Sequence, residues 1–163
     1  DPFAGLPDGE LLLFLEDERT RIGDSPANAL WIEQVYGAQT LARYRNERIS
    51  CSGTTIGSHL AMSGYLERML WEGRPEVAQR MGRYRGYDQG IHNVLLHSGA
   101  LAGATCVANG EFVWTLHNVP DHEIAVASDG LHTIRGQRPA VVHQYPVKPL
   151  AKRWVESAYP RAT

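Results

Sequence analysis

The sequence predicts an α/β fold in which a mixed sheet is flanked by helices. Over the first hundred residues, stretches with apolar residues at helical spacing alternate with short apolar runs typical of strands. Beyond Gly99 the pattern changes to short strand-like runs separated by Asn-Gly, Asp-Gly and Arg-Gly turn signals. The chain contains no linker rich in proline, glycine or serine, so we expect residues 1–163 to form one domain.

Six helices are expected from apolar residues at helical spacing and from signals at the helix ends. The first has the clearest boundaries, because Ser25 can cap it, Pro26 fits its first helical position and Gly37 ends it. The helices are expected over residues 27–36, 38–44, 59–71, 76–83, 88–97 and 150–157.

Five strands are expected from short apolar or β-branched runs bounded by turn residues. The first ends at Glu16-Asp17-Glu18, where we expect the chain to leave the core in a charged loop. The stretch from Ile49 to Ser58 begins as a strand and then gathers small residues, which predicts a strand, a small-residue turn and a helix. The strands are expected over residues 11–16, from residue 49, and over 104–107, 112–116 and 140–145.

The composition excludes several classes of protein. With 43% hydrophobic and 21% charged residues, the chain is neither disordered nor collagen-like. Its net charge of −2 argues against a nucleic-acid partner, because phosphate binding needs a clustered surplus of lysine and arginine. The longest apolar run, residues 11–15, is far shorter than the roughly 20 residues of a membrane span. Two cysteines are too few for a disulfide scaffold, and without CxxC spacing they do not predict a structural zinc site. This cysteine usage permits a reducing compartment, and we expect the cytoplasm.

The first candidate site is the run Cys51-Ser52-Gly53-Thr54-Thr55. Gly53 has no Cβ and lets a ligand approach the backbone closely, and the flanking hydroxyls can hydrogen-bond sugar or phosphate oxygens. Alternatively, the segment is a tight crossover in which the hydroxyls only cap the next helix. A further alternative is a nucleophile, Cys51 or Ser52, activated by a histidine, although no GxSxG elbow is present.

The second candidate site lies in the run from Asp88 to Asn93. Asp88 and His92 are four residues apart, as are Gln89 and Asn93, so each pair shares one face of a helix. These polar groups need partners if they face inward, and a helix N-terminus favours an anion nearby. In the alternative interpretation, Asp88 only caps the helix and His92 lies on the surface.

The third candidate site pairs His143 with Lys148. His143 ends an apolar strand and Lys148 follows in a loop bounded by prolines, so both side chains can converge at the carboxyl edge of the sheet. Open α/β sheets bind ligands at that edge. There a histidine can ligate a metal and a lysine can hold a phosphate. Alternatively, backbone groups satisfy the histidine.

Taken in order, these segments resemble the second half of a GT-A-type glycosyltransferase, a fold that uses nucleotide-sugar donors. Glycogenin-like retaining enzymes carry a strand with Asn-Ser-Gly, then Asp-Gln-x-x-x-Asn, then a histidine followed by Gly-x-Lys-Pro. The more specific resemblance, to a little-characterised glycosyltransferase-like group, spans nearly the whole chain. The glycogenin-like pattern is matched here by Cys51-Ser52-Gly53, by Asp88-Gln89-Gly90-Ile91-His92-Asn93 and by His143 with Lys148-Pro149. The more specific group shares Asp1-Pro2-Phe3, the runs 51–57 and 87–93, and His143-Gln144-Tyr145.

The resemblance implies metal-dependent transfer of a sugar, with retention, from a UDP- or GDP-sugar to a glycan, protein or small-molecule acceptor. Mn²⁺ or Mg²⁺ and a lysine would neutralise the charge that gathers on the departing diphosphate. The implied roles are catalysis near the anomeric carbon for Asp88 and Gln89, substrate binding for Ser52, Gly53, Thr54, Asn93 and Lys148, and metal ligation for His143.

Three departures from the family pattern stand out. Cys51 replaces the asparagine before Ser-Gly, and Val147 replaces the glycine before Lys-Pro. The sequence also contains no Asp-x-Asp metal motif near a strand end, since the acidic triplet Glu16-Asp17-Glu18 does not lie where the family has that motif. We therefore expect the chain to begin just after the nucleotide-binding half of its fold. The departures also motivate two alternatives: an inactive sugar- or nucleotide-binding domain of the same fold, and a cysteine- or serine-type hydrolase.

Overall fold

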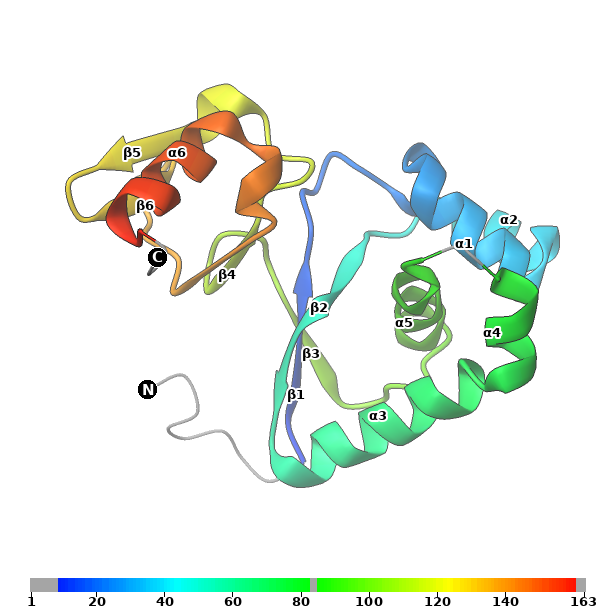
Figure 1. Cartoon of the computed structure of the whole chain (residues 1–163). Helices are drawn as coiled ribbons and strands as arrows, with labels where there is room; N and C mark the ends of the chain where they lie inside the picture. Colours follow the sequence, from blue (N-terminus) through cyan, green and yellow to red (C-terminus); the bar gives the residue numbers. More distant parts are fainter. Residues whose placement is uncertain (1–8, 83–84, 161–163) are drawn as a thin grey trace.

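The structure, a computed structural model, describes residues 9–82 and 85–160 and has a mixed α/β architecture (Figure 1). Its main sheet has three strands in the order β2-β1-β3. The central strand runs antiparallel to β2 and parallel to β3, so the expected mixed sheet is confirmed. The strands are β1 (Leu11–Leu15), β2 (Ser50–Gly57) and β3 (Ala104–Val107).

Five helices lie on one side of this sheet (Figure 1). The expected start of the first is confirmed, since Ser25 Oγ accepts from the backbone N–H of Asn28 and Pro26 is the first helical residue. Where the structure describes the chain, no helix is long and apolar enough to cross a membrane. The helices are α1 (Pro26–Tyr36), α2 (Ala38–Tyr44), α3 (His59–Glu72), α4 (Pro75–Met81) and α5 (Tyr87–His97). Residue 83, the expected end of the fourth helix, lies outside the described residues.

Strand β2 is longer than the sequence predicts. It continues through the small residues to Gly57, with Thr55 opposite Leu13 and Gly57 opposite Leu11 of β1. The expected small-residue turn is therefore wrong. The physical reason is that β-branched residues favour extended backbone and that residues 55–57 pair with β1, although the register shifts between the Leu13–Thr55 and Leu15–Ser50 pairs.

A second, smaller region follows β3. It contains a parallel pair, β4 with β7, and a hairpin, β5 with β6, which helix α6 covers (Figure 1). The sequence did not predict the hairpin strands, because they are only four residues long and most of β5 faces solvent. The elements are β4 (Val113–Thr115), β5 (Ile124–Ala127), β6 (Gly130–Thr133), β7 (Val141–His143), α6 (Pro149–Ala158) and the 3₁₀ turns η1 (Ile22–Asp24), η2 (Asp121–Glu123) and η3 (Tyr145–Val147).

Helix α5 is the central helix, because it packs against both the sheet and α1. Its buried face joins Ile91 and Leu95 to Leu13 of β1, while Gly90 lies against the backbone of α1. A Cβ at Gly90 would stand 2.9 Å from the Cβ of Trp31. This close approach of two helices fixes how α5 presents its first turn to β2.

We expect Gly90→Ala to lower the free energy of unfolding by about 1–2 kcal/mol, because crowding against α1 outweighs the gain in helix propensity. Gly64→Ala is the matched control. Gly64 lies within α3 with nothing within 4 Å of its Cβ position, so this change is expected to be neutral or to stabilise by up to about 1 kcal/mol. Urea denaturation measures both, and equal stability of the two variants would contradict the packing described here.

Candidate functional site

Three segments that are far apart in the sequence meet at the middle of β2. The backbone N–H of Ser52 donates to Gln89 Oε1 at 2.7 Å, and its hydroxyl donates to Asp88 Oδ2 at 3.0 Å. On the other side, a Cβ at Gly53 would stand 3.2 Å from His143 Nε2. The structure therefore brings the candidate residues of β2, α5 and β7 into one site.

The buried layer of this site holds β2 by its backbone. Asn93 Oδ1 accepts from the backbone N–H of Ser50 at 2.8 Å, and its Nδ2 donates to the carbonyls of Ser50 and Gln89. Gln89 Nε2 also donates to the Ser50 carbonyl at 2.9 Å. We call these two amides the clamp. Both are buried and engaged within the protein, so in this structure they position β2.

His92 also contacts β2, through the side chain of Ser50. Its Nε2 lies 2.9 Å from Ser50 Oγ and its Nδ1 lies 2.9 Å from the hydroxyl of Tyr65. Because Ser50 Oγ donates its proton to the Phe14 carbonyl, we assign the ring proton to Nε2 and the accepting lone pair to Nδ1. Burial lowers the pKa of His92 to about 4, so the ring is neutral at neutral pH.

The interpretation in which Asp88 only caps α5 and His92 lies on the surface is wrong. His92 is fully buried. The helix is capped by Gly86, whose φ of 87° lies in the left-handed region that glycine adopts readily, and Asp88 lies in the first turn. Asp88 is exposed, so its carboxylate is reachable from solvent at the positive end of the helix.

Glu16 joins the site, contrary to the sequence-based expectation of a charged loop. It is only 5% exposed, and its two carboxylate oxygens accept from Gln89 Nε2 at 3.2 Å and from Asn118 Nδ2 at 3.0 Å. Burial raises the pKa of Glu16 to about 7. The available signal was its position directly after a buried strand, at the edge where α/β sheets place functional groups.

The part of the site that a ligand can reach consists of Ser52, Gly53, Thr54, Asp88 and His143, which we call the exposed face. Gly53 and Asp88 are exposed, whereas the other three are partly buried. Thr54 Oγ1 donates weakly to the Cys51 carbonyl, at 3.5 Å. The exposed face thus offers two hydroxyls, a carboxylate and an imidazole around a residue without a side chain.

His143 has the properties of a metal ligand but does not form a metal site by itself. Burial lowers its pKa, so the ring is neutral, and within the described residues neither ring nitrogen is hydrogen-bonded. Over residues 9–82 and 85–160, however, no group of three or more histidine, cysteine, aspartate or glutamate side chains is arranged to hold a metal ion. His143 therefore provides at most one ligand of a shell that the described residues do not complete.

Lys148 lies apart from the exposed face. Its Nζ pairs with Asp121 Oδ1 at 3.1 Å, and its side chain is only 14% exposed. Within the described residues no hydrogen bond joins it to β2 or α5. A phosphate at Lys148 would have to compete with Asp121 for the ammonium group.

The geometry disfavours a cysteine- or serine-type hydrolase. Cys51 is buried, and burial raises the pKa of its thiol, whereas a nucleophilic cysteine needs a lowered pKa. The hydroxyl of Ser52 donates to Asp88 and not to a histidine. Neither side chain has the activated arrangement that nucleophilic catalysis requires.

Comparison of the chain with protein-family models, with curated proteins and with solved structures gave no match. The residues of this site and the order of their motifs therefore carry the functional proposal.

Proposed function

We propose that the chain belongs to a GT-A-type glycosyltransferase that transfers a sugar, with retention, from a UDP- or GDP-sugar to a glycan, protein or small-molecule acceptor. The observation that supports this most strongly is the convergence at β2. Ser52 bonds Asp88 and Gln89, and Gly53 lies against His143. These are the residues whose motifs, in the same order, resemble those of the family.

In this proposal the exposed face binds the donor sugar. Gly53 leaves room for the sugar ring against the backbone, and the carboxylate of Asp88 accepts hydrogen bonds from its hydroxyls. Ser52 already donates to Asp88 Oδ2, which fixes the orientation of that carboxylate before the donor arrives. Gln89 acts as a positioning residue, because its amide holds the Ser52 N–H from beneath.

A divalent cation, Mn²⁺ or Mg²⁺, would neutralise the negative charge of the departing diphosphate when bound. His143 would provide one ligand through a ring nitrogen. The remaining ligands would come from the diphosphate and from acidic residues other than those described here.

We expect His143→Ala to weaken metal-dependent donor binding by about 10-fold or more while the fold is retained, because the residue ends a strand and is only partly buried. The measurement is isothermal titration of the full-length protein with UDP- and GDP-sugars, with and without Mn²⁺, beside thermal unfolding. His132→Ala is the control, because His132 bonds Asp129 in the hairpin and is no part of the exposed face.

Three results would count against the proposal or its parts. If none of the UDP- and GDP-sugars binds, the proposed transferase function is contradicted. Unchanged metal-dependent binding in His143→Ala removes His143 from the metal site. If His143→Ala does not fold, His143 has a structural role in the core and the assignment of a metal ligand is contradicted.

A second candidate is a domain of the same fold that binds the donor without transferring it. It is favoured by Gln89, because both atoms of its amide group are engaged within the protein and neither is free to assist the reaction. This candidate predicts donor binding without release of nucleotide diphosphate. Slow release of free UDP from a UDP-sugar by the intact protein would exclude it.

A further inference from the structure

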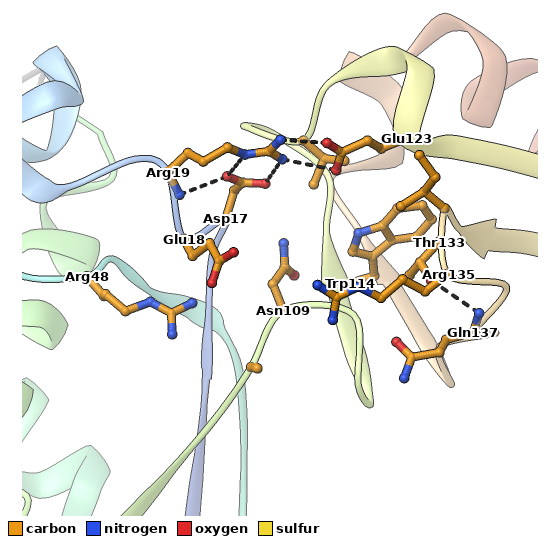
Figure 2. Close-up of a pocket in the computed structure, with 13 residues that line it drawn as sticks. Asp17, Glu18, Arg19, Arg48, Asn109, Trp114, Glu123, Thr133, Arg135 and Gln137 are labelled. Carbon is orange, nitrogen blue, oxygen red and sulfur yellow. Dashed lines mark hydrogen bonds and ion pairs between the residues drawn. The ribbon is translucent and has the colours of Figure 1, made fainter.

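A pocket of about 290 Å³ opens beside the site, between the end of β1 and the smaller region (Figure 2). Its walls come from the loop after β1, from the segment joining β3 to β4 and from the turn after β6. None of the residues lining it belongs to the exposed face or to the clamp. The pocket is therefore a second candidate site with its own chemistry.

The formal charges around this pocket cancel. Three arginines line it against three carboxylates, and Arg19 already engages two of these carboxylates, because it forms paired hydrogen bonds with both Asp17 and Glu123. The other charged groups are of both signs, so the wall offers a ligand hydrogen-bond donors as well as an acceptor. The other charged lining residues are Glu18, Arg48 and Arg135.

Within the part of the chain that the structure describes, Arg48 has a buried donor without a hydrogen-bond partner. This donor is its Nε, and one terminal nitrogen reaches the Glu16 carbonyl only at 3.4 Å. Figure 2 shows Arg48 and Arg135 on opposite sides of the space. The Nε itself is buried, so a ligand oxygen in the pocket would instead reach the terminal nitrogens of Arg48, which make only this one weak hydrogen bond within the described residues.

The remaining wall is apolar. Trp114, Val119 and Ile134 line the pocket beside the polar groups. A ligand that matches both kinds of wall needs an apolar C–H face and a rim of hydroxyls, which donate to carboxylates and accept from guanidinium groups. A volume of about 290 Å³ lies at the lower end of the range for small-molecule pockets and suits a single ring.

We propose that this pocket binds one ring of a neutral saccharide. The charged groups of both signs, the weakly engaged terminal nitrogens of Arg48 and the mixed polar and apolar walls together favour this class over a hydrocarbon. The pocket also adjoins the site, since the Glu16 carbonyl accepts from Arg48 while the Glu16 carboxylate faces Gln89. The binding itself does not depend on the proposed transferase function.

The test is saturation-transfer NMR and titration of the full-length protein, without nucleotide or metal, with methyl α-glucopyranoside, methyl β-galactopyranoside and methyl α-mannopyranoside. At least one glycoside is expected to bind in the millimolar range. Arg135→Ala and Gln137→Ala, at exposed lining residues, are expected to weaken it about 3- to 10-fold each. Arg138→Ala is the matched control, because Arg138 is equally exposed on the same turn but pairs with Asp129 outside the pocket.

The proposal is overturned if none of the three glycosides binds, or if both lining variants bind with unchanged affinity. It is also overturned if glucose 6-phosphate binds more tightly than the glucoside and loses that advantage in Arg135→Ala, since the pocket would then select an anion. Because no donor is present, these outcomes are independent of the donor titrations.

Discussion

Asn93→Ala is expected to lower the free energy of unfolding by about 3 kcal/mol. Asn93 is fully buried, and its amide makes three hydrogen bonds, two of them with the backbone of Ser50. Alanine would leave the Ser50 N–H without its acceptor and would open a small cavity beneath β2. Of the two clamp amides, only that of Gln89 would then hold the backbone of β2.

Urea denaturation measures this change, with two comparison variants. Asn93→Asp keeps an acceptor for the Ser50 N–H but places an oxygen against the carbonyls of Ser50 and Gln89, so it should also destabilise. Asn46→Ala, in an exposed turn, should change the free energy of unfolding by no more than about 0.5 kcal/mol. A loss below about 1 kcal/mol in Asn93→Ala would contradict the clamp.

Glu16 is expected to make the protein less stable as the pH rises from about 4.5 to about 7. In this window the unfolded carboxyl group is ionised while the buried one keeps its proton, so unfolding releases a proton and the free energy of unfolding falls with pH. Integration between pH 5 and pH 8 gives a loss of about 2.5 kcal/mol from this group. In Glu16→Gln that loss should disappear.

The comparison with the wild type is needed because His92 acts in the opposite direction. Its pKa of about 4 in the folded state lies below the usual 6.5, so it makes the protein more stable as the pH rises between these values. Subtracting the Glu16→Gln curve from the wild-type curve isolates Glu16. Glu18→Gln, at an exposed neighbour, should follow the wild type. Parallel curves for the wild type and Glu16→Gln would show that Glu16 is not buried as described.

Features set by local sequence were predictable. The start of α1 follows from Ser25 and Pro26, and the first strand follows from a continuous apolar run. The length of β2 was not predictable, because pairing with β1 extends a segment whose small residues locally suggest a turn. The β5–β6 hairpin escaped detection for a related reason, since its short strands depend on the covering helix α6 and on each other.

In the candidate site, too, features set by local sequence were predictable and features set by distant contacts were not. Helical spacing correctly put Gln89 and Asn93 on one face, but only the position of β2 decides that this face is buried. The burial of Glu16, at the end of the first expected strand, was not predictable, because its two amide partners, Gln89 and Asn118, are distant in sequence. The pairing of Lys148 with Asp121 likewise depends on how the smaller region folds.

In the proposed function, the exposed face, formed by β2, α5 and His143 of β7, binds a nucleotide sugar. The most direct test of this binding is amide-resolved NMR of the full-length protein during titration with a UDP-sugar and Mg²⁺. The backbone amide signals of Ser52, Gly53, Thr54 and His143 are expected to shift together and saturate, while that of Gly64 on α3 stays unchanged. Saturable shifts confined to residues away from the exposed face, or no shifts with any UDP- or GDP-sugar, would contradict it.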